Sequence, residues 1–423
     1  MAGMTTQKRT GWTLSIIGMM ASCGAAMGGA TIVRLETLGG TSSQGFGIND
    51  NGVVVGQAAT SGDAALHAVM WINGVVTDLD PAGTDSAAYA VNNSDQIVGK
   101  GDRVGGGSDA MLWAGGTATN LGVDMSAVGS SVAWDINDNG LVVGQGSLGP
   151  GFAKGFVWSG PGAGIVAGSI PGYMGGANYG VNNDGIVVGS SFFFGDPDDA
   201  CLAFPDGMGG YNSSQISPAG FLFAQARAVN NSGVIMGHSG SPMGGPWNAC
   251  IFNADHDNTI QSLGTLPDLE TSEGFDINDS GVMVGWATDD DFVLDAHAWV
   301  YADGQMTDLN TLLDPGQTDW IVLLAAEKIN NNNDIVGWGI ASDGELAGFV
   351  MYGVLTPTPC VGDVTGPGGV PDGLVNVDDL NEILSAWGMN VGVGSRLDLA
   401  NNDGIIDVDD LNALLSNWNA TCG

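Results

Sequence analysis

One short motif occurs seven times between residues 48 and 337, and this repetition constrains the fold more than any other feature of the chain. The first copy begins Ile48-Asn49-Asp50-Asn51-Gly52 and ends Val55-Gly56. The first Asn residues of successive copies are separated by 43, 45, 45, 48, 48 and 52 residues. Periods of this length are typical of propeller blades and solenoid units.

The motif itself predicts a tight turn between two strands. Asn followed by Asp or Asn favours a turn, because these side chains cap local amides. The slot three residues after the first Asn holds Gly in five copies and Asp95 or Asn333 in the other two. All three residue types tolerate positive φ, so we expect a left-handed turn residue there, followed by a short strand such as Val53-Val54-Val55.

A glycine follows each of these short strands, seven residues after the first Asn of the copy. A glycine at a fixed place in a strand indicates close approach by a neighbouring strand. The seven are Gly56, Gly99, Gly144, Gly189, Gly237, Gly285 and Gly337.

Each unit continues with an apolar strand, a turn and a weaker strand, for example Val69-Met70-Trp71 and then Val75 to Leu79. About four strands per unit is the number in a propeller blade. The seventh unit lacks its last strand, and residues 32–39 before the first unit match it. We therefore predict an all-β, seven-bladed β-propeller over residues 31–353, closed by an N-terminal strand that removes the exposed edges. No helical periodicity occurs in 40–350, which argues against a helical solenoid.

The repeat resembles the HAF repeat of predicted extracellular bacterial proteins over roughly residues 40–352. His67-Ala68-Val69 and His297-Ala298-Trp299 are near matches to the tripeptide that gives that family its name. The resemblance implies secretion and a repeat array. It implies no established activity.

Residues 1–30 have the pattern of a signal peptide. Lys8 and Arg9 precede a short apolar stretch, and small residues follow up to Ala30. We therefore expect a secreted or cell-surface protein with no membrane span. Lipidation at Cys23 is the alternative, because residues 20–23 loosely match a lipoprotein cleavage box.

The charge balance excludes two classes of partner. Nine Lys and Arg stand against 46 Asp and Glu, for a net charge of -37. Such a surface repels nucleic acid and anionic lipid. The simplest interpretation of the acidity is solvation in a saline habitat.

A Thr/Pro linker at 354–359 leads to a duplicated C-terminal segment at 360–423. Residues 377–387 are matched by 408–418, and in both copies apolar residues fall at helical spacing. We expect two helices that bury each other's apolar stripes. Cys360 and Cys422 bracket the segment and predict a disulfide. Cys201 and Cys250 occupy matching slots of neighbouring repeats, so we expect two buried free thiols, with a bridge between them as the alternative.

Each helix follows an acidic loop with the oxygen spacing that calcium requires. The predicted ligands are Asp363, Asp372, Asn376 and Asp379 in the first loop and Asp398, Asn401, Asp403, Asp407 and Asp410 in the second. The alternative is a solvated acidic tail. Two such loop-helix units resemble a dockerin module, which implies a calcium cofactor and a cohesin-like or cell-surface protein partner. The Ser-Thr pair that usually reads a type I partner is replaced by Val377-Asp378 and Val408-Asp409.

No catalytic constellation stands out. The four His have no zinc spacing, and no nucleophile elbow or phosphate loop occurs. Two acidic loops, one with Asp196, Asp198 and Asp199 and one with Asp289 to Asp291 and Asp295, lie in the same connection of units four and six. Solvated loops are the simplest interpretation; calcium binding or carboxylate chemistry on glycans is the other.

We therefore expect a non-catalytic binding or surface-assembly protein with a polysaccharide as a possible ligand. The alternative is a secreted carbohydrate-active enzyme, a glycosidase or polysaccharide lyase, that uses Asp198 or Asp290.

Overall fold

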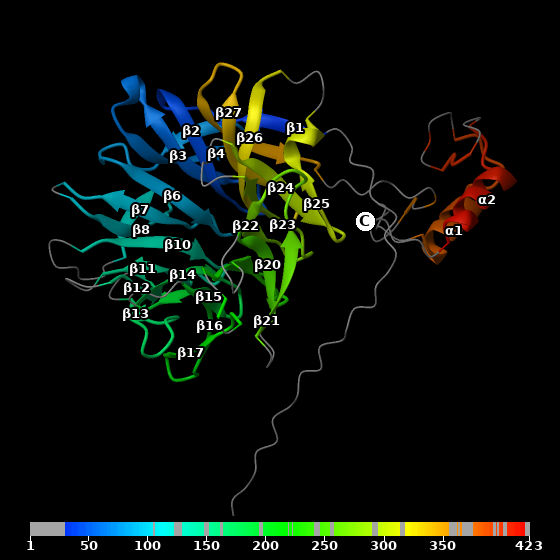
Figure 1. Cartoon of the computed structure of the whole chain (residues 1–423). Coiled ribbons are helices and arrows are strands. Elements are labelled where there is room, and N and C mark those ends of the chain that lie inside the picture. Colours follow the sequence, from blue (N-terminus) through cyan, green and yellow to red (C-terminus); the bar gives the residue numbers. More distant parts are fainter. Residues whose placement is uncertain are drawn as a thin grey trace, which may run out of the picture.

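The structure is a computed structural model (Figure 1). It describes residues 30–354, except 105, 122–128, 148–151, 161–163, 194–197, 219, 222, 241–245, 254–257, 290–294 and 314–317. In the C-terminal segment it describes 362, 364–365, 375–391, 395, 397–400 and 404–418. The expected signal peptide with Cys23, most of the linker, and Cys360 and Cys422 lie outside the described residues.

Seven antiparallel four-stranded sheets form a seven-bladed β-propeller, as the repeat predicts. The innermost strands are β2 (Gly39–Ile48), β6 (Ser86–Val91), β10 (Ser131–Ile136), β14 (Gly175–Val181), β18 (Gln225–Val229), β22 (Thr271–Ile277) and β26 (Trp320–Ile329). The second strands are β3 (Val54–Thr60), β7 (Ile97–Asp102), β11 (Val142–Gly146), β15 (Val187–Phe192), β19 (Ile235–Ser239), β23 (Met283–Thr288) and β27 (Ile335–Ala341). The third strands are β4 (Leu66–Ile72), β8 (Ser108–Ala114), β12 (Lys154–Trp158), β16 (Asp199–Pro205), β20 (Asn248–Asn253), β24 (His297–Ala302) and β28 (Leu346–Tyr352). The outer strands of blades one to six are β5 (Val75–Asp78), β9 (Thr117–Asn120), β13 (Ile165–Val166), β17 (Tyr211–Gln215), β21 (Thr259–Gly264) and β25 (Gln305–Asp308).

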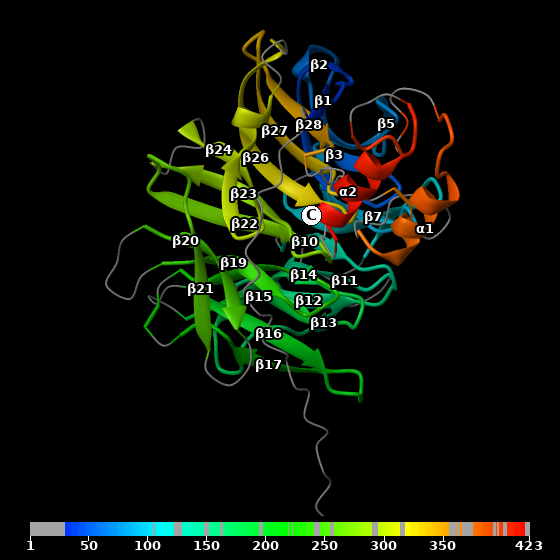
Figure 2. The same ribbon diagram turned by 90° about the vertical axis from the view of Figure 1, so that its right-hand side faces the viewer.

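The outer strand of blade seven comes from the other end of the chain. β1 (Thr31–Arg34) pairs antiparallel with β28, so Ile32 lies opposite Met351 and Arg34 opposite Phe349. The predicted closing strand is therefore present, with bounds a few residues shorter than 32–39. Figure 2 shows β1 beside β28 and β27, where the first and last parts of the array meet. Closure satisfies the edge of β28 that would otherwise stay open.

The repeated turn has the predicted conformation. At the slot three residues after the first Asn, φ is 58° at Asp95 and 64° at Asn333, and it is positive at the corresponding glycines. The side chain of Asn49 caps the turn through Oδ1, which accepts from the backbone N–H groups of Asn51 and Val53 at 3.1 and 2.9 Å. The turn chemistry read from the sequence is thus confirmed.

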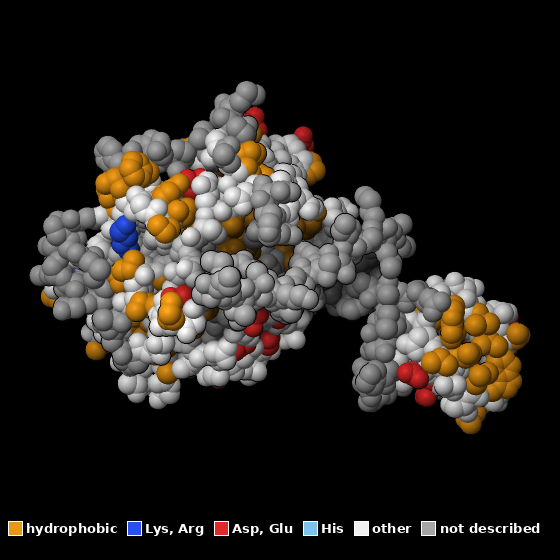
Figure 3. All heavy atoms as spheres, turned by 90° about the horizontal axis from the view of Figure 1, so that it is seen from below, with side chains coloured by type: hydrophobic (Ala, Val, Ile, Leu, Met, Phe, Trp, Pro, Cys, Tyr) orange, Lys and Arg blue, Asp and Glu red, His pale blue; other side chains and the backbone are white. Residues whose placement is uncertain are grey.

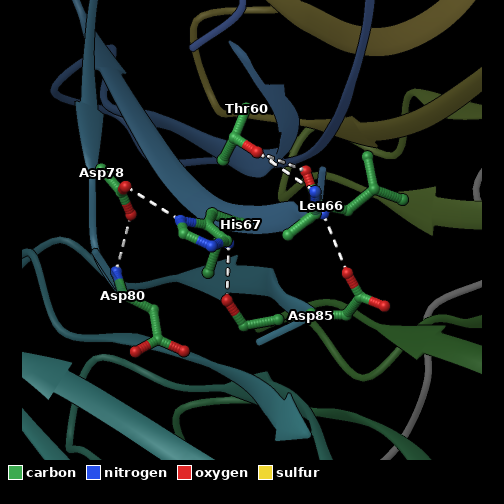
Figure 4. A network of polar contacts seen from close by, with 9 residues as sticks. Thr60, Leu66, His67, Asp78, Asp80 and Asp85 are labelled. Atoms are coloured by element: carbon green, nitrogen blue, oxygen red, sulfur yellow. Dashed lines mark hydrogen bonds and ion pairs between the residues drawn. The ribbon is translucent and has the colours of Figure 1, made fainter. Parts of the chain in front are cut away.

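Neighbouring blades are joined by serine hydroxyls at the start of the inner strands. The backbone N–H of Ala68 donates to Ser86 Oγ of the next blade at 2.9 Å, and Ala110 donates to Ser131 in the same way. Beside this contact His67 Nδ1 lies 2.9 Å from Asp78 Oδ2, and Leu66 N donates to Asp85 (Figure 4). The first His-Asp pair recurs in blade six as His297 and Asp308, at 2.7 Å. Because the pair recurs at the same strand position, both histidines have a structural role, in which they connect the third strand of the blade to its outer strand.

The C-terminal segment contains two helices, α1 (Val377–Ser385) and α2 (Val408–Ser416). Both begin with a capping box, with Asn376 and Asp407 as the N-caps. Their apolar stripes are buried only in part. Ile383 and Leu414 are fully buried, whereas Leu384 and Leu415 are about half exposed. The expectation that the stripes bury each other is therefore wrong for Leu384 and Leu415. The reason is that loop residues such as Val375 and Ile406 fill much of the small core.

Two further features can be read from the described residues. Cys201 and Cys250 are free and buried, as expected from their equivalent slots in adjacent blades. Among the helices that the structure describes, none has the length and apolar character needed to cross a bilayer.

Candidate ligand site in the propeller channel

All seven inner strands carry a β-bulge at the same place. The pairing with the second strand skips one residue, three positions before the first Asn of each motif. A bulge turns the side chain of the extra residue out of the regular alternation, and bulges are common next to functional sites. The seven bulged residues are Phe46, Tyr89, Trp134, Tyr179, Arg227, Phe275 and Glu327.

The repeated glycine explains why the bulge is possible. A Cβ on Gly144 would lie 2.0 Å from the carbonyl oxygen of Val132, two residues before the bulged Trp134. The corresponding clash in the other blades is 1.9 or 2.0 Å. The close strand approach predicted from this glycine is confirmed, and its function is to admit the bulged strand.

The seven bulged side chains, here called the belt, line one cavity in the centre of the propeller. The cavity has a volume of about 150 Å³. Drug-sized pockets are usually larger, so the belt accommodates a small molecule or one end of a larger one. Three belt aromatics touch in sequence: the ring centroids of Phe46 and Tyr89 are 5.4 Å apart, and those of Tyr89 and Trp134 are 4.7 Å apart.

A charged layer lies one residue along from the belt. Lys328 Nζ is 3.2 Å from Asp276 Oδ1 and 3.6 Å from Asp135 Oδ1. Burial lowers the pKa of Lys328, but the two carboxylates outweigh it and the net shift is upward, so the ammonium group stays charged. Burial raises the pKa of Asp276. These three side chains compensate one another and anchor blade seven to blades three and six.

The belt itself carries two charged residues. Glu327 Oε1 accepts from Trp338 Nε1 at 2.7 Å, and burial raises the pKa of its carboxyl group. Arg227 lies with its guanidinium carbon 4.5 Å from the ring centroid of Tyr179 and 5.4 Å from that of Phe275. Burial, with the charges of Asp102 and Glu327, raises the pKa of Tyr89 to about 12, so its hydroxyl remains a hydrogen-bond donor at neutral pH.

At the other end of the channel the motif asparagines form a closed ring. Each first Asn donates from Nδ2 to the backbone carbonyl of the first Asn in the next blade, at 2.7–3.1 Å, and Asn330 donates to Asn49. The second residue of each motif forms a parallel ring, in which its backbone N–H donates to the next side chain at 2.8–3.0 Å. The two rings explain the Asn-Asn or Asn-Asp pair by the contacts it makes between neighbouring blades, and they surround a polar opening of about 160 Å³.

The acidic loops of blades four and six are only partly within the described residues. Asp199 accepts hydrogen bonds from Tyr173, Gln215 and Ser217 at 2.6–2.9 Å, and Asp198 accepts from Gln225 at 2.7 Å. These contacts give both carboxylates a structural role within blade four and its junction with blade five. Asp196, Asp290 and Asp291 lie outside the described residues.

Of the predicted calcium ligands of the C-terminal segment, some lie within the described residues and others do not. Asp363, Asp372, Asn401 and Asp403 lie outside the described residues. Asp379 and Asp410 are buried, and each accepts three backbone N–H groups, at 2.7–2.9 Å and 2.7–3.0 Å. Asn376 and Asp407 cap the helices. Among the described residues no three His, Cys, Asp or Glu side chains converge as a metal site.

Asp398 is different from the other predicted ligands. Its Oδ2 accepts from the backbone N–H of Gly404 at 2.9 Å, which folds the loop back on itself. Its Oδ1 is buried and has no hydrogen-bond partner among the residues that the structure describes. A buried carboxylate oxygen left unpaired is costly, and a cation would satisfy it. Asp398 therefore fits a calcium ligand, whereas both carboxylate oxygens of Asp379 and of Asp410 accept backbone N–H groups.

The C-terminal helices also present an apolar surface. Figure 3 shows hydrophobic side chains gathered on one side of this segment. Exposed apolar residues of the segment include Val377, Leu384, Trp387, Val408 and Leu415, each 47–57% exposed. Contiguous apolar surface of this kind marks an interaction site.

The belt was not predicted from the sequence, although a signal for it is present. The position three residues before the first Asn holds a large side chain in every copy, and in five copies it is aromatic. Regular alternation along a strand would not send that side chain into the channel. Only the bulge, which is a property of the pairing, gives the position its meaning.

Comparison with known proteins supports the fold and no more. No family model matches the chain, and no curated protein matches it. Solved propellers do: a puromycin hydrolase mutant complexed with PGG is 13% identical over 72% of this chain and 51% of its own, with a TM-score of 0.50. A puromycin-hydrolysing peptidase of Mycobacterium tuberculosis is 13% identical over 80% of this chain and 60% of its own, also at 0.50.

An ulvan lyase bound to its saccharide is 10% identical over 77% of this chain and 93% of its own, with a TM-score of 0.41. The chain spans only about half of the length of the puromycin hydrolase and three fifths of that of the puromycin-hydrolysing peptidase. At these identities the likeness shows the propeller fold alone. The resemblances to HAF repeats and to dockerins stay predictions.

Proposed function

We propose that this protein is a secreted or cell-surface, non-catalytic binding protein that takes a small ring-shaped ligand, or the end unit of a polysaccharide, into its channel. The observation that carries the proposal is the belt. Seven bulges direct one side chain per blade into a single cavity, and five of these side chains are aromatic. Aromatic faces bind rings by stacking and by burying apolar surface.

A binding role accounts for the chemistry of the belt better than catalysis does. Glu327 is bonded to Trp338, and the nearby Asp135 and Asp276 are paired with Lys328. The carboxylates around the cavity are thus held by other groups, whereas two carboxylates flanking a scissile bond are needed for glycoside hydrolysis. Asp198, the residue that an enzyme hypothesis singled out, is bonded to Gln225.

The C-terminal segment is proposed to tether the propeller to a protein partner when calcium is bound. Asp398 supplies a buried, unpaired oxygen for the cation, and the apolar surface of α1 and α2 supplies an area for a partner. A cohesin-like protein is the partner class that the dockerin resemblance implies. The lysine, arginine and apolar residues at the N-terminus support export.

Calorimetry with a panel of mono- and disaccharides and small aromatic acids tests the channel site. We expect saturable binding, and Trp134→Ala should weaken it about 30-fold, the size of effect seen when a well-packed aromatic anchor is removed. Phe204→Ala, which removes an exposed aromatic on β16, is the control and should bind as the wild type does. Equal affinities of the Trp134 variant and the wild type would show that the belt is not the site. Cleavage of any probe would show that the protein is an enzyme.

A further inference from the structure

Arg227 is held in the belt by aromatic rings. It is the bulged residue of β18, and Tyr179 of blade four and Phe275 of blade six flank its guanidinium at 4.5 and 5.4 Å. Cation–π attraction to the two rings stabilises the planar group at this place in the belt. When rings cover the faces of a guanidinium, its N–H groups are left pointing outward at the edge.

No acceptor within the described part of the chain uses those N–H groups. Six Lys and Arg side chains fall within the described residues, and five of them have a polar partner. Arg34 pairs with Asp343, Lys100 with Asp102, Arg103 with Asp109, Lys154 with the carbonyl of Tyr173, and Lys328 with two aspartates. Arg227 has neither a hydrogen bond nor an ion pair with a described residue, although it is half-buried in a cavity.

The charged groups around Arg227 leave it free for a ligand. Lys328 is compensated by Asp135 and Asp276, and Glu327 gives an oxygen to Trp338. Glu273 lies with its Oε2 3.9 Å from His238 Nδ1, and none of the ion pairs between described residues involves Arg227. The guanidinium nitrogens of Arg227 are not among the buried unpaired atoms of the described residues, so they are accessible from the cavity and an oxyanion of a ligand can reach them.

We propose that Arg227 binds an oxyanion carried on the ring-shaped ligand of the channel. This inference rests on the proposed function and narrows it to acidic ligands: a ring bearing a carboxylate or sulfate, as in an acidic sugar or an aromatic acid. Guanidinium groups bind such oxyanions through paired N–H bonds. Because blade five lies across the seven-membered ring from blades one and two, an anion at Arg227 places the attached ring against Phe46 and Tyr89.

The size of the cavity agrees with such a ligand. A volume of about 150 Å³ has room for one ring with its charged group. A longer chain could enter only by one end.

Two matched pairs of probes test the proposal on the full chain. Glucuronate is compared with glucose, and benzoate with benzyl alcohol, by calorimetry at constant ionic strength. Within at least one pair we expect the acid to bind at least tenfold more tightly than its neutral partner, since a hydrogen bond to a charged group contributes about 1.5–3 kcal/mol. The pair that shows the preference distinguishes a sugar acid from an aromatic acid.

Variants at Arg227 identify the receptor of the anion. R227Q should weaken binding of the acid at least tenfold and bring it to the level of the neutral partner in the same variant. R227K keeps the charge without the paired geometry, so its preference for the acid should fall between those of R227Q and the wild type. R34Q, which removes an exposed guanidinium on β1, is the matched control and should retain the full preference. Circular dichroism and thermal melting confirm that each variant is folded.

The outcomes separate this inference from the proposed function. If the neutral partners bind as tightly as the acids, or if R227Q keeps the preference, the channel is a binding site but Arg227 is not an anion receptor. If none of the four probes binds to the folded wild-type protein, both proposals fail.

Discussion

The repeated residues of this protein have two kinds of role: some hold the blade together, and others line the central cavity. The first Asn of each motif and the glycine seven residues later are fixed by geometry, because one caps a turn and joins the ring and the other admits the bulged strand. The belt position has no such constraint, and its side chain changes from Phe to Arg to Glu around the ring. The sequence alone could identify the Asn and glycine positions, since the same residue type recurs at the same place in every copy of the motif.

The glycine constraint predicts a large effect of a single methyl group. In Gly144→Ala the new Cβ would meet the carbonyl oxygen of Val132 at 2.0 Å, which the paired backbones can relieve only by moving. We expect a loss of about 3 kcal/mol in the free energy of unfolding, measured by urea denaturation. Gly233→Asn is the control, because φ there is 81° with open space around the site, and Asn333 occupies the equivalent slot. Equal stabilities of the two variants would contradict the argument.

At the scale of elements, the two loop-helix units show where local sequence is a good guide. Both helices, their capping boxes and the equivalent positions of Asp379 and Asp410 follow from the duplicated segment. The burial of the apolar stripes did not follow, because a nine-residue helix shares its core with the loops. The calcium loops stay a prediction: Asp398 fits a ligand, and several other predicted ligands lie outside the described residues.

Removal of calcium tests the loop of Asp398. Calcium alone, titrated into the full chain freed of metal, should bind measurably and raise the melting temperature of the helical signal, because ligand binding stabilises the folded state. Asp398→Asn should weaken calcium binding at least tenfold, since it removes the charge of the unpaired oxygen while keeping the shape. The matched control Asp378→Asn, at an exposed position in α1, should bind calcium as the wild type does. Identical melting with calcium and with chelator would contradict a calcium site.

At the scale of the whole molecule, the seven blades form a ring, and the stability of the propeller depends on the contacts that close this ring. The two rings of hydrogen bonds at one end of the channel connect every blade to the next. In addition, β1 completes the last sheet at its outer edge. The residues that close the ring are about 280 positions apart in the chain, as in the contact of Asn330 with Asn49. Closure of this kind is a tertiary event that no local segment can stabilise alone.

Loss of the closing strand should therefore weaken the entire propeller. A chain that starts at residue 39 lacks β1 together with the buried side chains of Ile32 and Leu35, and it leaves the edge of β28 open. Compared with a chain that starts at residue 30, we expect a loss of about 3 kcal/mol or more from the lost apolar burial, and a melting temperature lower by roughly 5–10 °C. Self-association through the open edge should appear in sedimentation. Indistinguishable melting of the two chains would show that β1 does not close the ring.

The sequence by itself determined the seven blades, their turns, the closing strand and the two capped helices, because each is encoded by short-range chemistry that recurs with the repeat. Only the tertiary structure decided what the protein offers to a ligand. The bulges arise from pairing between strands, and the channel exists only when seven blades meet. Whether a described residue pairs with Arg227 depends on what the other blades place near it. These properties arise only when distant parts of the chain come together, because successive belt positions lie 43 to 52 residues apart in the chain.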